Sequence, residues 1–148
     1  PPLRGAEDVH ELRRAVADGT IDVIGTDHAP HRPVDKALPF PEAKPGMTAL
    51  EQAFSVILET LVNPGLIDLS RAVEIMSRTP ARLARVPHQG GQLRVGEEAN
   101  LTLVDLERRG SVDAESSKSM GRNNPYDGLD LPDPIRYTIW RGAITYCG

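Results

Sequence analysis

The sequence predicts an α/β fold in two parts: an α/β part over residues 1–86, then a mostly β part over residues 87–148. Two observations predict this division. Before Val86, apolar residues recur at helical spacing on both sides of one short apolar run. After Val86 this spacing stops, and short strand-like runs alternate with Gly-rich and polar turns. We therefore expect two domains, 1–86 and 87–148.

Residues 7–18 are predicted to form an amphipathic helix, with an apolar face made of Val9, Leu12, Ala15 and Val16. Gly19 is well placed to end it, because glycine readily adopts the left-handed conformation that follows many helices. The run over residues 21–25 is nearly all apolar, which is typical of a parallel strand buried on both faces.

Residues 30–46 are predicted to form a long loop, because prolines stand at positions 30, 33, 39, 41 and 45. Loops of this length are often functional. Residues 48–62 then predict a helix with one apolar face. Thr48 and Glu51 have the spacing of a capping box, in which each side chain binds a backbone N–H at the helix start.

Residues 70–78 predict another helix, and Thr79-Pro80 predicts the start of a separate short helix that ends at Arg85. In the second part, short strands are predicted over residues 92–95, 101–106 and 135–147, the last folded into a hairpin at Arg141-Gly142. Residues 111–134 are polar and predict a loop.

Composition excludes several function classes. The net charge of −4 gives no basic surface for nucleic acid, and no apolar run reaches the length of a membrane span. Cys147 is the only cysteine, which fits a reducing, cytoplasmic compartment. The chain begins with Pro1-Pro2 rather than Met, and these first residues resemble neither a signal peptide nor a transit peptide, so we expect a boundary inside a longer protein.

Candidate chemistry lies in Thr26-Asp27-His28-Ala29-Pro30-His31, directly after the predicted strand at residues 21–25. In α/β barrels the carboxyl ends of the strands carry the chemistry. An Asp at such a place can bind a metal and can also move a proton. Taken alone, without the surrounding motif, Asp27 better suits an N-cap or a turn at the end of a strand.

The hexapeptide resembles the last-strand signature of dihydroorotases, in their larger form with a barrel and a β domain. Further segments resemble this family in the same order: Pro1-Pro2-Leu3-Arg4, Thr79-Pro80-Ala81, Gly96 to Leu101, Ser117-Lys118, Asn123-Asn124-Pro125 and the Arg141-Gly142 turn. The resemblance implies that residues 1–86 are the last part of a (β/α)8 TIM-like metal-dependent hydrolase barrel. It implies that residues 87–148 belong to a small accessory β-sandwich domain.

The family closes N-carbamoyl-L-aspartate to dihydroorotate, reversibly, in pyrimidine biosynthesis. The resemblance implies that Asp27 binds one zinc of a binuclear Zn²⁺ site and shuttles the proton. It implies that His31 holds the substrate carboxylate, and that Pro45 and Gly46 line the substrate ring. Outside these roles, we expect His28 to fix the strand end by hydrogen bonding rather than to bind metal, and Lys36 to be a solvated charge. His10 and His88 receive no role.

The resemblance implies further metal ligands, among them a His-x-His pair after the first barrel strand. This sequence contains no His-x-His, and the other ligands are missing too. A single carboxylate cannot hold a catalytic metal, so we expect this chain alone to be inactive. Alternatives are a hydantoinase or allantoinase, a non-catalytic subunit that scaffolds aspartate carbamoyltransferase, or a gene remnant. Expected partners are the small-molecule substrate, aspartate carbamoyltransferase and further copies of the chain.

Overall fold

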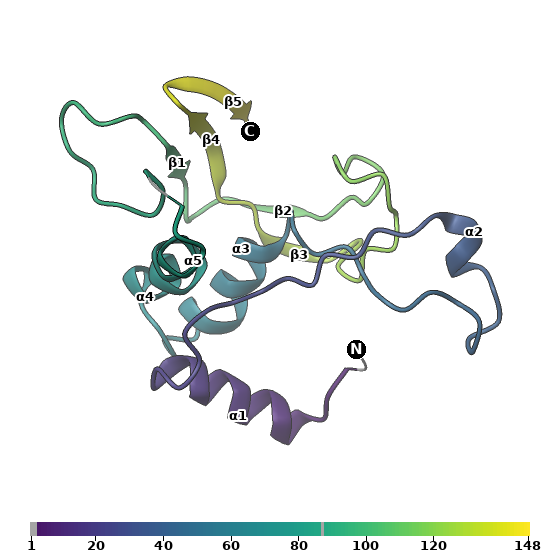
Figure 1. Cartoon of the computed structure of the whole chain (residues 1–148). Helices are drawn as coiled ribbons and strands as arrows, with labels where there is room; N and C mark the ends of the chain where they lie inside the picture. Colours follow the sequence, from purple (N-terminus) through teal and green to yellow (C-terminus); the bar gives the residue numbers. More distant parts are fainter. Residues whose placement is uncertain (1–2, 87) are drawn as a thin grey trace.

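The computed structural model describes residues 3–86 and 88–148. Figure 1 shows a group of helices, two small antiparallel sheets above and beside it, and a long arm that projects to one side. The predicted α/β fold is confirmed, since helices dominate up to Ala84 and all five strands follow Val86. The segment Pro1-Pro2 and the domain boundary at residue 87 lie outside the described residues.

Helix α1, Ala6–Ala17, confirms the first predicted helix to within one residue at each end. Gly19 follows it with φ +88°, as expected of a helix-ending glycine. Only one α1 side chain, Val16, is buried. Val16 joins a cluster of buried apolar residues from the later helices and their connection: Ile57, Leu61, Ile67, Ala72 and Ile75.

The predicted strand over residues 21–25 is wrong, because the segment is extended but lies in neither of the described sheets. Ile21 and Ile24 pack on the buried cluster. The N–H of Ile21 donates to the carbonyl of Ala15 at 2.9 Å, and that of Ile24 donates to the carbonyl of Ile75 at 3.2 Å. A strand needs a neighbouring strand for its ladder, and here helix residues lie alongside instead. The predicted apolar character is confirmed, but within the described residues no strand lies beside the segment.

The third helical region begins later than predicted. Helix α3, Ala53–Ile57, continues directly into the π-helical turn η1, Leu58–Val62. Residues 50–52 form a turn, and α3 has no side-chain cap. The predicted capping box is therefore wrong. Glu51 instead accepts hydrogen bonds from residues 117–119, which lie far along the chain.

Helix α4, Leu69–Val73, the π-helical turn η2, Glu74–Arg78, and helix α5, Thr79–Ala84, form one continuous helical stretch. The predicted break at Thr79 is wrong, because its backbone is helical, with φ −67° and ψ −45°. The wider π turn lies immediately before this point. Proline lacks an N–H and its ring crowds the carbonyl one turn earlier, so a widened turn suits Pro80.

The second part contains a three-stranded antiparallel sheet in the order β1-β4-β5: Leu101–Val104, Ile135–Trp140 and Ala143–Cys147. The predicted hairpin is confirmed. Its two loop residues, Arg141 and Gly142, both have positive φ, +51° and +81°, as a tight two-residue hairpin loop requires. Residues 92–95 form no strand, contrary to prediction.

The stretch predicted as loop over residues 111–134 also holds regular structure at its two ends. Strands β2, Arg109–Ser111, and β3, Asp130–Pro132, pair in a two-stranded sheet. Strand β3 lies against α3 and η1, so this segment returns to the first part of the chain. Between the strands, residues 112–129 pass beside the segment that carries the candidate site (Figure 1).

One further short helix lies inside the predicted loop over residues 30–46: α2, Pro33–Lys36, with Pro33 at its first position. None of the helices in residues 3–86 and 88–148 is long and apolar enough to cross a membrane.

Candidate active site

Asp27 stands at the end of the extended segment with its side chain exposed. Its φ of +47° lies in the left-handed region, which is uncommon for residues other than glycine but is tolerated by Asp. Within the described residues its carboxylate takes part in no hydrogen bond or ion pair. The turn at Asp27 redirects the chain and leaves both carboxylate oxygens available for chemistry.

His28 fixes the end of this extended segment to the next element. Its Nδ1 accepts hydrogen bonds from the N–H groups of Ala49 and Leu50, both at 3.1 Å. Because Nδ1 accepts twice, the neutral ring carries its proton on Nε2. His28 thus makes the hydrogen-bonding contact expected of it, and Nδ1 is already occupied by backbone donors.

His31, Pro45 and Gly46 lie close together in the structure. His31 Nε2 lies 2.7 Å from the carbonyl oxygen of Pro45, so this nitrogen donates. A Cβ placed on Gly46 would lie 3.2 Å from the same Nε2 and 2.6 Å from Ala29 Cβ. Gly46 also has φ +119°, so only glycine fits this position without strain.

The loop between Ala29 and Met47 is closed at its base. The N–H of Ala29 donates to the carbonyl of Met47 at 2.9 Å. Lys36 Nζ donates to the carbonyls of Lys44, at 2.8 Å, and of Gly46, at 3.2 Å. Lys36 is therefore not the solvated charge predicted, since it holds the two sides of the loop together.

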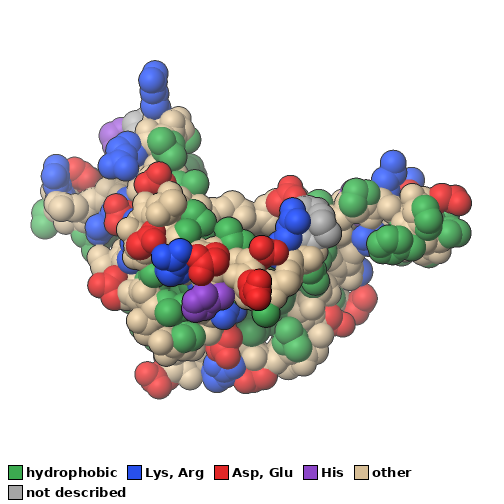
Figure 2. All heavy atoms as spheres, turned by 90° about the horizontal axis from the view of Figure 1, so that it is seen from below, with side chains coloured by type: hydrophobic (Ala, Val, Ile, Leu, Met, Phe, Trp, Pro, Cys, Tyr) green, Lys and Arg blue, Asp and Glu red, His purple; other side chains and the backbone are tan. Residues whose placement is uncertain are grey.

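The outer part of the loop projects away from the rest of the chain and carries exposed apolar side chains. Figure 2 shows hydrophobic atoms gathered on this arm, at the right of the view. Phe40 is 95% exposed and Val34 is 64% exposed. The base of the loop is thus ordered by hydrogen bonds, whereas Phe40 and Val34 in its outer part remain largely exposed.

Asn123 also lies at this site, although no role was predicted for it from the sequence. Its side-chain Oδ1 accepts from the N–H of His31 at 3.1 Å. Its Nδ2 donates to the carbonyls of Ala29, at 2.9 Å, and Gly46, at 3.1 Å. Its own carbonyl accepts from the N–H of Thr48 at 3.0 Å. The only sequence signal was its place in the Asn123-Asn124-Pro125 segment of the resemblance.

Two carboxyl groups near the loop, Glu51 and Asp35, have lowered pKa values. Burial works to raise the pKa of Glu51, but hydrogen bonds from Ser117 Oγ and from the amides of Lys118 and Ser119 outweigh it and lower the pKa. At the start of α2, hydrogen bonds from Arg32 lower the pKa of Asp35. Both carboxylates are thus held ionised by local donors.

The described residues do not form a metal centre by themselves. Across residues 3–86 and 88–148, no group of three His, Cys, Asp or Glu side chains lies close enough to hold an ion. Catalytic zinc sites take about three protein ligands. Asp27 can supply one at most. His10 and His88 are both exposed and lie outside this site.

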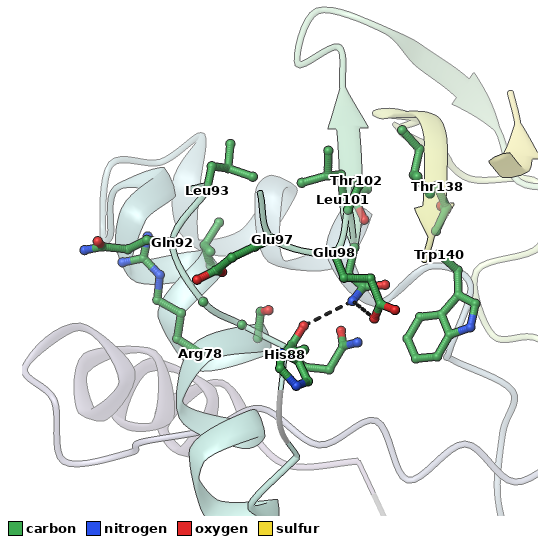
Figure 3. Close-up of a pocket in the computed structure, with 18 of the residues that line it drawn as sticks. Arg78, His88, Gln92, Leu93, Glu97, Glu98, Leu101, Thr102, Thr138 and Trp140 are labelled. Carbon is green, nitrogen blue, oxygen red and sulfur yellow. Dashed lines mark hydrogen bonds between the residues drawn. The ribbon is translucent and has the colours of Figure 1, made fainter. Parts of the chain in front are cut away.

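A cavity of about 810 Å³ lies outside the candidate active site, between the α4–η2 helix and strands β1 and β4. Figure 3 shows its wall, with Leu93, Leu101 and Trp140 among the labelled apolar side chains. Asn100 Nδ2 donates to the carbonyl of His88 and to Glu98 in this wall. None of the predicted site residues lines this cavity, so it is separate from the candidate active site.

Comparison with known proteins gives the following relations. The model of the amidohydrolase family matches residues 2–145. A dihydroorotase from Mycobacterium tuberculosis is 44% identical over 98% of this chain and 34% of its own length. A dihydroorotase from Streptomyces coelicolor is 46% identical with the same coverage. The chain thus spans about a third of the length of these relatives.

Solved structures confirm the predicted fold. The D-hydantoinase (dihydropyrimidinase) from Thermus sp. matches with a TM-score of 0.88 and 28% identity, over 99% of this chain and 33% of that one. The L-hydantoinase from Arthrobacter aurescens matches with a TM-score of 0.85 and 33% identity, over 97% of this chain and 33% of that one. The helices and sheets described above therefore take the arrangement found in part of these hydrolases.

Proposed function

Because the chain belongs to the amidohydrolase family, we propose that it forms the C-terminal third of a dihydroorotase. Such an enzyme interconverts N-carbamoyl-L-aspartate and dihydroorotate. The observation that carries this proposal is the 43–46% identity to four dihydroorotases over nearly the whole chain. The hydantoinase structures share less identity, 21–33%.

Asp27 is proposed as the proton shuttle. In the hydrolytic direction it takes a proton from the water that attacks the ring amide carbon, and returns it to the ring nitrogen as the C–N bond breaks. The exposed carboxylate and its position at the end of the extended segment support this role. His31 is proposed to hold the substrate carboxylate, with Pro45 and Gly46 against the ring.

The contacts of His31 set the orientation of its ring. With Nε2 committed to the Pro45 carbonyl, the ring is held in one orientation against Gly46. The close approach of Gly46 leaves its backbone unobstructed by a side chain.

Zinc is proposed as the cofactor, with Asp27 as one ligand and the remaining ligands outside residues 1–148. The domain assignment proposed here is 1–86 for the last part of the barrel and 87–148 for the accessory β domain. A cytoplasmic location, a homo-oligomer and contact with aspartate carbamoyltransferase complete the proposal. The single exposed, unpaired thiol of Cys147 fits a reducing compartment.

The test uses the whole protein that carries this chain. We expect zinc-dependent cyclisation of N-carbamoyl-L-aspartate, with kcat lowered about 10²–10⁴-fold by Asp27→Asn, the usual size of an acid–base contribution. Asp22→Asn is the matched control, since Asp22 is also exposed and lies on the same extended segment. Full activity in Asp27→Asn would contradict the assigned role.

A panel of substrates separates the alternatives. Hydrolysis of hydantoin or allantoin in preference to dihydroorotate would favour the hydantoinase or allantoinase alternative. Two matching solved structures are hydantoinases, which is why these substrates are included. No turnover of any cyclic amide, together with stable binding to aspartate carbamoyltransferase, would favour the non-catalytic subunit.

A further inference from the structure

Asn123 bonds to two backbone segments of the candidate site at once, residues 29–31 and residues 46–48. Its side-chain amide contacts Ala29, His31 and Gly46, and its backbone carbonyl contacts Thr48. We propose that Asn123 is a positioning residue for substrate binding: it holds His31 and Gly46 in the relative arrangement that receives the substrate carboxylate. This inference rests on the proposed function.

The three bonds define a single orientation of the Asn123 amide. The N–H of His31 needs an acceptor, whereas the carbonyls of Ala29 and Gly46 need donors. Only an amide with its oxygen toward His31 and its NH₂ toward the two carbonyls satisfies all three groups. The same bonds join the two sides of the loop base, since Ala29 precedes the loop and Gly46 ends it. An Asp or a Leu of similar size cannot supply both donors.

A second glycine allows Asn123 to reach this position. Gly121 is buried, and a Cβ on it would lie 2.8 Å from Asn123 Oδ1 and 2.8 Å from Pro30 Cα. Such contacts are closer than a real Cβ makes, so only glycine lets this segment approach Pro30. The segment is therefore shaped to bring Asn123 against the loop base.

Neighbouring residues fasten the same segment to the turn before α3. Glu51 accepts from the N–H of Lys118 at 3.1 Å and of Ser119 at 3.0 Å. Asn124 Nδ2 donates to Gln52 Oε1 at 3.1 Å. These contacts hold the segment but do not touch His31 or Gly46. Asn124 therefore provides a control of the same residue type, one position away.

The contacts of Asn123 predict an effect on binding more than on chemistry. They include His31 and Gly46, the groups proposed to receive substrate, but not the carboxylate of Asp27. We call the Asn123 side-chain hydrogen bonds to Ala29, His31 and Gly46 the clamp. Loss of the clamp should move the His31 ring and the Gly46 backbone apart, which weakens substrate binding. The proton shuttle at Asp27 would be left in place.

The kinetic test compares Asn123→Asp with Asn124→Asp in the whole protein. Asn123→Asp keeps the acceptor for His31 but loses both donors and places a negative charge against two carbonyls. We expect KM for N-carbamoyl-L-aspartate to rise about tenfold or more and kcat to change less than about threefold. Asn124→Asp also loses a donor, but should leave KM within about twofold of wild type.

A double-mutant cycle with His31→Ala separates positioning from general structure. If Asn123 acts through His31, the effects of Asn123→Asp and His31→Ala on KM will be less than additive. Additive effects, an unchanged KM in Asn123→Asp, or an equal rise in Asn124→Asp would each overturn the proposal.

Hydrogen exchange tests the clamp without any substrate. Peptides that cover residues 28–32 and 44–50 should exchange faster in Asn123→Asp than in wild type or Asn124→Asp. Unchanged exchange in these peptides would overturn the proposal even if the enzyme is a dihydroorotase. Faster exchange in a protein that does not act on N-carbamoyl-L-aspartate would instead support the clamp and contradict the proposed function.

Discussion

Gly46 lies so close to Ala29 that a Cβ on the glycine would be 2.6 Å from Ala29 Cβ. The two residues are 17 positions apart and form the base of the loop that carries His31. The Ala29 N–H donates to Met47, directly after the glycine, at 2.9 Å. This contact sets how far apart the two sides of the candidate site can be.

Substitution of this glycine should therefore disturb both stability and binding. Gly46→Ala places a methyl group against Ala29 and forces a side chain into φ +119°. We expect the free energy of unfolding to fall by about 1–3 kcal/mol, as for other strained backbone positions, and the KM of the whole enzyme to rise. Urea unfolding and steady-state kinetics measure the two effects.

Gly65→Ala is the control for backbone strain alone. Gly65 also has positive φ, +75°, but a Cβ there would meet nothing within 4 Å. We expect some loss of stability and no change in KM. An equal change in KM for both variants would contradict a specific role for the Ala29–Gly46 contact.

The Glu51 carboxylate should stabilise the fold near neutral pH and lose this contribution in acid. Its pKa is lowered in the folded chain, because the donors from residues 117–119 outweigh the opposing effect of burial. A lowered folded-state pKa contributes stability above the unfolded-state value, and that stability is lost as pH falls through the folded-state pKa. Thermal unfolding between about pH 5 and about pH 3 should therefore show a smaller drop in Tm for Glu51→Gln than for wild type. Parallel curves for the two proteins would contradict this assignment.

Arg71 anchors the extended segment that leads to Asp27. Its Nη2 donates to the carbonyl of Ile21 at 2.9 Å and to that of Val16 at 3.4 Å. Arg71→Met keeps the apolar stem but leaves these carbonyls without the guanidinium donor. We expect the free energy of unfolding to fall by about 1–3 kcal/mol, measured by urea unfolding.

Glu74→Ala is the matched control for Arg71. Glu74 pairs with Arg71 Nη1 at 3.4 Å, but the carbonyl bonds of Nη2 do not depend on it. Partly exposed ion pairs contribute about 0–1 kcal/mol, so this variant should change stability little. A loss as large as that of Arg71→Met would show that the ion pair, not the backbone anchor, carries the effect.

Sequence periodicity predicted some local elements and not others. Val16 was expected on the apolar face of the first helix and is buried, whereas Leu12 on the same predicted face is 52% exposed. The hairpin at Arg141-Gly142 was predicted from two residues, because a two-residue loop requires positive φ and glycine adopts it at low cost. The Asp27–His31 run was predicted to be the site from its resemblance to the dihydroorotase signature, and this stays a prediction.

Features that depend on distant partners were missed or misread. Glu51 has the spacing of a capping box, but donors 66 to 68 positions later bind its carboxylate. Lys36 was expected in solvent, but two carbonyls of its own loop accept from it. Strands β2 and β3 are three residues each, too short for a reliable alternation pattern.

The α/β fold, helix α1, the final hairpin and the residues proposed for the chemistry could be predicted from the amino acids alone. These depend on local preferences: side-chain periodicity, backbone φ and residue type. The three-dimensional structure was needed to show that residues 21–25 lie against helices rather than in a sheet, and that Asn123 joins Ala29, His31 and Gly46. The physical reason is that a hydrogen-bonding group accepts whichever partner the fold brings within about 3 Å, and no local pattern specifies a partner that lies 77 to 94 positions away.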